Sequence, residues 1–125
     1  MNILMGRTVL FALLTWAVMP NAQAEMPSAE AEEAVQKAAY VEAIRAQVLA
    51  QWVKPYTVHR GQLCPVVIHQ APGGHVIQFK VEAPCEFEAE GMNSLERAVL
   101  ASSPLPYYGF EQVFSPRIRL RFLAE

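Results

Sequence analysis

The sequence predicts an α+β domain of two layers, in which helices cover one face of a three-stranded antiparallel sheet. Three features support this prediction: a long segment with helical spacing, two β-branched runs joined by a turn rich in proline and glycine, and an alternating strand near the end of the chain. A short second helix is expected between the hairpin and the last strand. The order helix, hairpin, helix, strand is typical of α+β domains.

The long N-terminal helix is predicted over residues 28 to 52, which contain neither glycine nor proline. Large apolar side chains recur at every fourth position, on one stripe of a helix; they are Tyr40, Ile44, Val48 and Trp52. Ser28 is a suitable start, and Pro55 marks the end. Residues 25 to 39 contain few large apolar side chains. We therefore expect a helical N-terminal extension over 25 to 39 and the domain itself over 40 to 125.

The hairpin is predicted from two β-branched runs, residues 66 to 68 and 76 to 81, on either side of the turn residues 71 to 74. In this turn Pro72 presets the first position and a glycine supplies the positive φ of the next. The second run alternates in polarity, which predicts one buried face; it consists of Ile77, Phe79 and Val81. We expect the long helix to pack on this face, so that Trp52 and Phe79 share one core.

The second helix is expected to begin at Asn93 or Ser94, either of which is a good N-cap, and to end before Pro104. Its core-facing side chains are predicted to be Leu95, Ala98 and Val99. The last strand alternates without interruption, which predicts a half-buried antiparallel strand. Its two faces are Ile118, Leu120 and Phe122 on the core side, and Arg117, Arg119 and Arg121 on the other.

Residues 1 to 24 have the organisation of a cleavable signal peptide: Arg7 precedes an apolar segment, and the last three residues, Ala22 to Ala24, match the small-x-small cleavage pattern. A retained membrane anchor is the alternative, but the apolar run is only half of the roughly 20 residues that span a bilayer. We expect export to the periplasm and, after cleavage, a protein that is not integral to the membrane.

Cys64 and Cys85 are expected to form a disulfide in that oxidising compartment, since they stand at neighbouring ends of the predicted hairpin. A redox-active pair is the alternative. Their spacing is not C-x-x-C, and nothing nearby in the sequence would lower the pKa of a thiol. We therefore favour a structural bridge, which stabilises a small domain by about 3 kcal/mol.

The composition argues against several classes of function. Ten basic and twelve acidic residues give a net charge of −2, so no overall positive field favours nucleic acid. The three histidines, His59, His69 and His75, have no carboxylate or cysteine at ligand spacing, so no metal site is expected. No G-x-S-x-G motif surrounds any of the candidate serines, which are Ser94, Ser102 and Ser103. We expect no catalysis, no cofactor and no small-molecule substrate.

Two surface features leave alternatives open. The three arginines of the last strand are expected to contact an acidic partner or phospholipid surface, or to protect a solvated edge strand from self-pairing, and the two roles are compatible. An aromatic cluster is expected to act as a lid on the core in preference to a binding surface; it consists of Tyr107, Tyr108, Phe110 and Phe114.

Together the segments resemble the C-terminal domain of the TolA family, which is related in fold to that of TonB. The matching pieces are the stripe from Tyr40 to Trp52, residues 61 to 68, the turn at residues 72 to 74, residues 96 to 106 and the closing residues 119 to 122. The resemblance implies a periplasmic protein-binding module of a Gram-negative cell envelope, acting in envelope integrity. Its partner would be a Tol-Pal component, another outer-membrane-associated protein, or a toxin or phage protein.

In this family the partner adds a strand to the open edge of the sheet. By resemblance, the receiving edge is the strand made of Arg117, Ile118, Arg119, Leu120, Arg121 and Phe122. Family members that transduce force keep a membrane helix with a Ser/His signature and a long spacer. Neither is found here, so we expect a free-standing docking head. The alternative is a structural or accessory subunit of another envelope machine, such as a secretion or conjugation apparatus.

Overall fold

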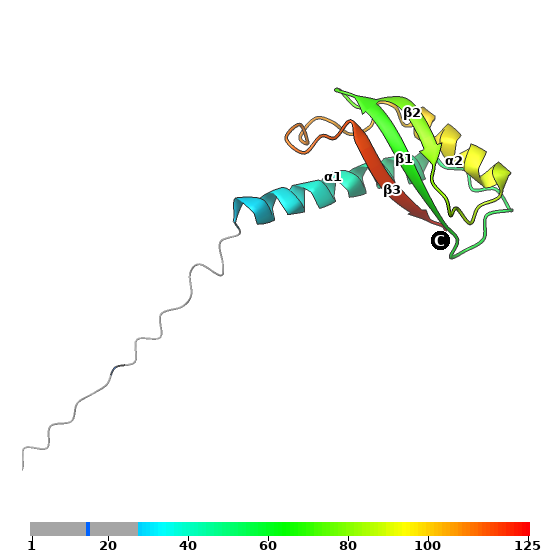
Figure 1. Ribbon diagram of the computed structural model, residues 1–125, viewed down its shortest axis with the longest axis horizontal. Helices are drawn as coiled ribbons and strands as arrows, with labels where there is room; N and C mark the ends of the chain where they lie inside the picture. Colours follow the sequence, from blue (N-terminus) through cyan, green and yellow to red (C-terminus); the bar gives the residue numbers. More distant parts are fainter. Residues whose placement is uncertain (1–14, 16–27) are drawn as a thin grey trace, which may run out of the picture.

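The structure is a computed structural model that describes residue 15 and residues 28 to 125. Its elements follow the predicted order (Figure 1): α1 (Ala29–Gln51), β1 (Leu63–Ala71), β2 (His75–Val81), α2 (Ala89–Ala101) and β3 (Arg117–Leu123). The predicted α+β class is confirmed. The predicted signal peptide, residues 1 to 24, lies outside the described residues apart from Thr15. None of the described helices combines the length and the hydropathy needed to cross a membrane.

Helix α1 begins where the sequence predicts. The Oγ of Ser28 accepts a hydrogen bond from the Ala31 amide at 3.1 Å, which satisfies one of the unpaired donors at the helix start. The stripe residues Tyr40, Ile44 and Val48 are buried. Residues 29 to 39 are exposed on all sides, and in Figure 1 this half of α1 extends beyond the sheet.

The three strands form one antiparallel sheet in the order β2-β1-β3, so β1 is central and the other two strands are edges. Val66 in the middle of β1 lies opposite Val81 of β2 and Leu120 of β3. The hairpin turn has the predicted chemistry, since Gly73 adopts a φ of +96°. A side chain at Gly74 would collide with the backbone of Leu105, so this position also requires glycine.

Strand β2 contains an irregularity that the alternation did not predict. Gln70 pairs with Val76 while His69 pairs with Gln78, which leaves Ile77 as an extra residue. Ile77 is 69% exposed. The prediction that Ile77 faces the core is therefore wrong, because the bulge shifts the alternation by one residue. Val76 packs against the core instead, together with Phe79 and Val81.

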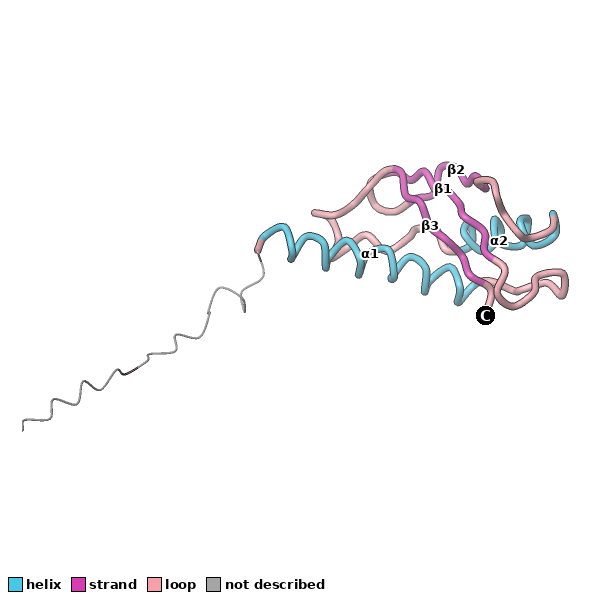
Figure 2. Tube along the Cα trace, turned by 60° about the horizontal axis from the view of Figure 1, so that its bottom comes forward, coloured by secondary structure: helices cyan, strands magenta, loops and turns pink. Residues whose placement is uncertain are grey.

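The helices cover one face of the sheet, but with a different assignment from the predicted one. Helix α1 packs against β3 and α2, whereas α2 packs against β2 (Figure 2). The expected packing of α1 on the β2 face is therefore wrong. Trp52 and Phe79 are both half-buried at the border of one core, and the ring of Trp52 stacks on Phe87 with centroids 5.7 Å apart.

Helix α2 begins five or six residues earlier than predicted, with Glu88 at the N-cap. The N-cap assignment to Asn93 or Ser94 is wrong, because Ser94 lies inside the helix and its hydroxyl is used in tertiary contacts. Its Oγ donates to the carbonyl of Val53 at 2.7 Å and accepts from Trp52 Nε1 at 2.8 Å. The predicted core-facing residues are buried as expected; they are Leu95, Ala98 and Val99.

A disulfide joins Cys64 to Cys85, as predicted. It ties the second residue of β1 to the segment that follows β2, and Cys64 is completely buried. The bridge therefore fixes the end of the sheet at which β1 also meets the end of β3.

Candidate partner-binding edge

Strand β3 lies at one edge of the sheet, and its two faces differ in the predicted way. Ile118, Leu120 and Phe122 are buried, whereas the three arginines between them are exposed. The strand therefore shows one face to the core and one to solvent. That this edge accepts a partner strand stays a prediction.

The ladder fixes which backbone groups of β3 point away from the sheet. At one end the Ala124 amide donates to the Gln62 carbonyl at 2.9 Å, and at the other the Gln70 amide donates to the Pro116 carbonyl at 2.9 Å. Because the direction alternates along an antiparallel strand, the residues of β3 that bond to β1 are the even-numbered ones. The amides and carbonyls that face outward belong to Arg117, Arg119, Arg121 and Leu123.

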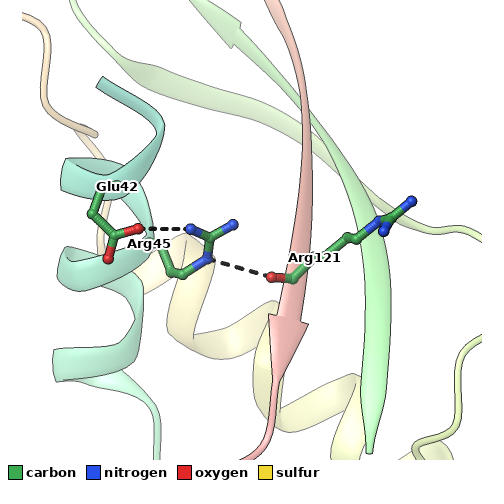
Figure 3. A network of polar contacts seen from close by, with 3 residues as sticks. All are labelled: Glu42, Arg45 and Arg121. Carbon is green, nitrogen blue, oxygen red and sulfur yellow. Dashed lines mark hydrogen bonds and ion pairs between the residues drawn. The ribbon is translucent and has the colours of Figure 1, made fainter. Parts of the chain in front are cut away.

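Two of these outward carbonyls are already occupied by side chains. The hydroxyl of Ser115 donates to the carbonyl of Arg117 at 2.7 Å. Arg45 of α1 donates from Nε to the carbonyl of Arg121 at 3.4 Å, and Glu42 holds the same guanidinium at 2.7 Å (Figure 3). Within residues 28 to 125, no side chain bonds to the outward amide or carbonyl of Arg119.

The opposite edge of the sheet is covered where β2 begins. The Val76 amide donates to Ser103 Oγ at 3.0 Å, and the Leu105 amide donates to the Gly74 carbonyl at 2.7 Å. The bulge at Ile77 further disrupts the regular ladder on this side. Of the two edges, β3 therefore offers the longer regular row of outward backbone groups.

A groove of about 520 Å³ runs beside the first half of β3. Its walls are the N-terminal half of α1 and the segment that precedes β3. Apolar side chains that line it include Tyr40, Val41, Val113 and Ile118. The two charged residues contributed by α1, Glu33 and Lys37, pair with each other at 3.2 Å.

A buried polar contact holds the segment before β3 against α1. Gln70 Nε2 donates to the Tyr40 hydroxyl at 2.6 Å and to the Ser115 carbonyl at 2.8 Å. Burial raises the pKa of Tyr40, and the hydrogen bond from Gln70 opposes that shift. The contact therefore fixes the position of Ser115, and with it the start of β3, relative to α1.

The outer face of the sheet, which no helix covers, carries most of the positive charge near this edge. Arg119 and Lys80 both lie opposite Val67 of β1, one on each side. Val67 is buried on this outer face, consistent with the stems of long side chains covering it. Arg119 Nε lies 3.4 Å from Glu82 of the neighbouring segment.

Apart from Phe114, which lines the groove beside β3, the other residues considered in the sequence do not converge on this edge. Among the described residues, no group of three potential metal ligands forms. The hydroxyls of Ser94 and Ser102 donate to backbone carbonyls inside the fold. In the aromatic cluster Phe110 and Phe114 pack on the core as a lid, while Tyr108 is 86% exposed.

Sequence reasoning did not single out Gln70 or Arg45. A signal for Gln70 exists, because it is a polar residue at an inward position of a β-branched run, after Val66 and Ile68. Arg45 looks like an ordinary exposed partner of Glu42 on one helix. Nothing in its local sequence relates it to Arg121, since the contact depends on how α1 crosses the sheet.

Neither a protein-family model nor a curated protein matches the sequence. The structure is similar to a solution NMR structure of TolAIII bound to a peptide derived from the N-terminus of TolB. The TM-score is 0.59 with 20% sequence identity, over 70% of this chain and 73% of the other. The chain has a TolA C-terminal-like fold.

The resemblance found in the sequence is thus confirmed at the level of the fold. The elements that make up a TolA C-terminal-like fold here are the two helices and the three-stranded antiparallel sheet.

Proposed function

We propose that this chain is a periplasmic protein-binding module of the TolA C-terminal type, which docks a component of the cell envelope by adding the partner's strand to β3. The proposal rests on one observation above all. The regular edge of the sheet is a strand with a row of outward backbone groups and a groove beside its first half, in a fold of which one solved structure carries a TolB peptide.

Two further features support the proposed compartment. The disulfide between Cys64 and Cys85 fits an oxidising environment. The leader predicted over residues 1 to 24 supplies the route of export.

A proline at position 119 tests the mechanism. The amide of Arg119 faces outward, so Arg119→Pro removes a donor for the partner without breaking a bond to β1. Arg119→Ala is the matched control, because it removes the same side chain and keeps the amide. Calorimetry with a peptide from the N-terminus of TolB measures binding, and a thermal melt verifies that both variants fold.

We expect the wild type and Arg119→Ala to bind the TolB peptide, and Arg119→Pro to lose detectable binding. A folded Arg119→Pro protein that binds as tightly as the wild type would falsify the strand-addition mechanism, and the aromatic cluster around Tyr108 would replace it as the site. A wild-type protein that leaves the TolB peptide unbound overturns the assignment to a Tol-type function.

A further inference from the structure

We propose that the strand received by β3 is amphipathic, with carboxylates at every second position facing Arg117, Arg119 and Arg121, and apolar side chains between them facing the groove. This inference rests on the proposed strand addition and adds the chemistry of the partner to it. It follows from three features of the edge: the direction of its backbone groups, the charge of one face and the lining of the other.

The register of an added strand is set by the outward backbone groups. A partner residue that bonds to the outward amide and carbonyl of Arg119 lies directly opposite Arg119, about 5.5 Å away between Cα atoms. Opposite residues in a sheet point to the same face. The partner residues opposite Arg117, Arg119 and Arg121 therefore all point to the outer, helix-free face of the sheet.

That outer face is positively charged. Among the described residues, neither Arg117 nor Arg121 lies within ion-pair distance of a carboxylate, and Arg119 has Glu82 at 3.4 Å. Lys80 stands on the same face, on the far side of Val67. Side chains at alternate positions of two paired strands repeat with the same spacing of about 6.8 Å, so three carboxylates match three arginines.

The partner residues between the carboxylates point to the other face, toward α1. There the apolar wall of the groove includes Tyr40, Val41 and Val113, and the charged pair from α1, Glu33 and Lys37, is internally neutralised. The remaining lining is polar and consists of Gln112, Ser115, Arg117 and Arg119. Apolar side chains fit the apolar wall because they remove it from water.

A phospholipid surface is the alternative binding partner for the three arginines. The outer face offers four cations, at the lower limit of the roughly 4 to 8 that a polybasic membrane site uses. A bilayer lying against that face would also leave the groove on the opposite face unfilled. The geometry therefore favours a polypeptide strand.

Capped seven-residue peptides test the pattern. The first alternates valine with three glutamates, the second has the same composition with its glutamates in one central block, and the third replaces each glutamate of the first with glutamine. Only the alternating acid peptide places three carboxylates on one face of a strand. On the protein side, an Arg117→Gln, Arg119→Gln, Arg121→Gln variant keeps the backbone edge and removes the charge.

We expect the alternating acid peptide to bind about tenfold more tightly than the blocked or glutamine peptide, since cross-strand ion pairs contribute about 0.2 to 1 kcal/mol each. The preference should vanish in the triple glutamine variant and weaken with salt. Equal binding of all three peptides overturns the inference. So does binding of anionic vesicles that depends on the arginines while the peptides are not distinguished.

Failure of the inference can be told apart from failure of the proposed function by including Arg119→Pro. If this variant loses every peptide while the wild type does not distinguish among them, strand addition stands and the charge pattern is wrong. If it binds the peptides as the wild type does, strand addition itself is wrong.

Discussion

Gln70 and Tyr40 form a polar contact inside an otherwise apolar core, and their chemistry makes the stability of the fold depend on pH. Gln70 is 2% exposed and its Nε2 donates to the Tyr40 hydroxyl. Gln70 Nε2 also donates to the Ser115 carbonyl, whereas the buried Oε1 has no hydrogen-bond partner among the described residues. The two donated bonds specify one arrangement of α1 over the sheet.

Ionisation of Tyr40 should destabilise the protein at high pH. Burial raises the pKa of Tyr40 above its usual value of 10.0, so the folded state holds the phenolic proton more tightly than the unfolded state does. The resulting stabilisation is complete below about pH 10, the pKa in the unfolded chain, and is lost as the pH rises through the folded-state pKa.

Urea unfolding of the wild type and Tyr40→Phe, followed from neutral to strongly alkaline pH, measures this effect. Tyr40→Phe should be less stable by about 1 kcal/mol at neutral pH, because it removes the hydrogen bond to Gln70. The difference should shrink or reverse at alkaline pH. A difference between the two proteins that stays constant across the range contradicts the assignment to Tyr40.

Trp52 shows where sequence reasoning at the level of residues reaches its limit. Its place on the apolar stripe of α1 predicted burial, and the indole does pack at the border of the core. Trp52 and Phe79 pack against the same core, as predicted, but the direct partners of Trp52 are Phe87 by stacking and Ser94 by hydrogen bonding. Periodicity predicts which face of a helix is apolar. The side chains that this face contacts depend on where the helix lies relative to the sheet.

Among the elements, the strands and helices with uninterrupted periodicity were predicted best. The alternation of β3 and the apolar stripe of α1 are not interrupted, so the side chains that are buried are the ones that the apolar pattern predicts. In β2 the bulge at Ile77 reverses the alternation halfway. A bulge follows from pairing with β1, and the sequence of β2 alone carries no signal for it.

The start of α2 was missed for a related reason. Glu88 makes no side-chain N-cap hydrogen bond, whereas the better capping residues Asn93 and Ser94 lie inside the helix. Tertiary contacts override the capping preference: Gly91 fits closely against Val58 and Phe87, and Ser94 is hydrogen-bonded to Trp52 and Val53, the two residues that follow α1.

Helix α1 restricts the edge that β3 offers. Arg45 donates to the outward carbonyl of Arg121, a group that an added strand would use (Figure 3). Glu42 holds the guanidinium in place on its other side. The guanidinium must leave before a partner strand extends along the edge to position 121.

We expect Arg45→Ala to strengthen binding of the TolB peptide by about two- to tenfold, since it frees one carbonyl whose hydrogen bond contributes about 0.5 to 1.5 kcal/mol. Arg97→Ala is the control, because it removes the same charge from an exposed position of α2 that does not line the groove beside β3. Calorimetry compares the three proteins. An Arg45→Ala protein that binds no more tightly than Arg97→Ala shows that the contact does not restrain the edge.

At the scale of the whole molecule, the two-layer arrangement places two distinct surfaces on one strand. Because helices cover one face of the sheet only, the alternating side chains of β3 contact the core on one side and solvent on the other. The order of elements and this layering were predictable from the sequence. The resemblance had also placed β3 at an edge of the sheet, where the strand order puts it. The groove beside that edge was not predicted, because it depends on how α1 crosses the sheet, and no local pattern encodes this long-range packing.

The disulfide stabilises this arrangement as a whole, and its removal should lower stability without altering the edge. Cys64 and Cys85 are 21 residues apart in sequence, and closing such a loop contributes about 3 kcal/mol by restricting the unfolded chain. For a domain of this size that corresponds to a fall in Tm of roughly 10 to 20 °C. Thermal melts of the wild type with and without a reductant, beside a Cys64→Ala, Cys85→Ala variant, measure the effect.

The reductant should lower the Tm of the wild type to that of the double variant and leave the double variant unchanged. Below that temperature both proteins should bind the TolB peptide equally, because the bridge is attached to β1 opposite Phe122, whereas the outward groups of β3 point away from β1. If protein isolated from the periplasm has alkylatable thiols and its Tm is the same with and without the reductant, the bridge is not part of the native protein. If the double variant folds but no longer binds, the bridge positions the edge as well as stabilising the fold.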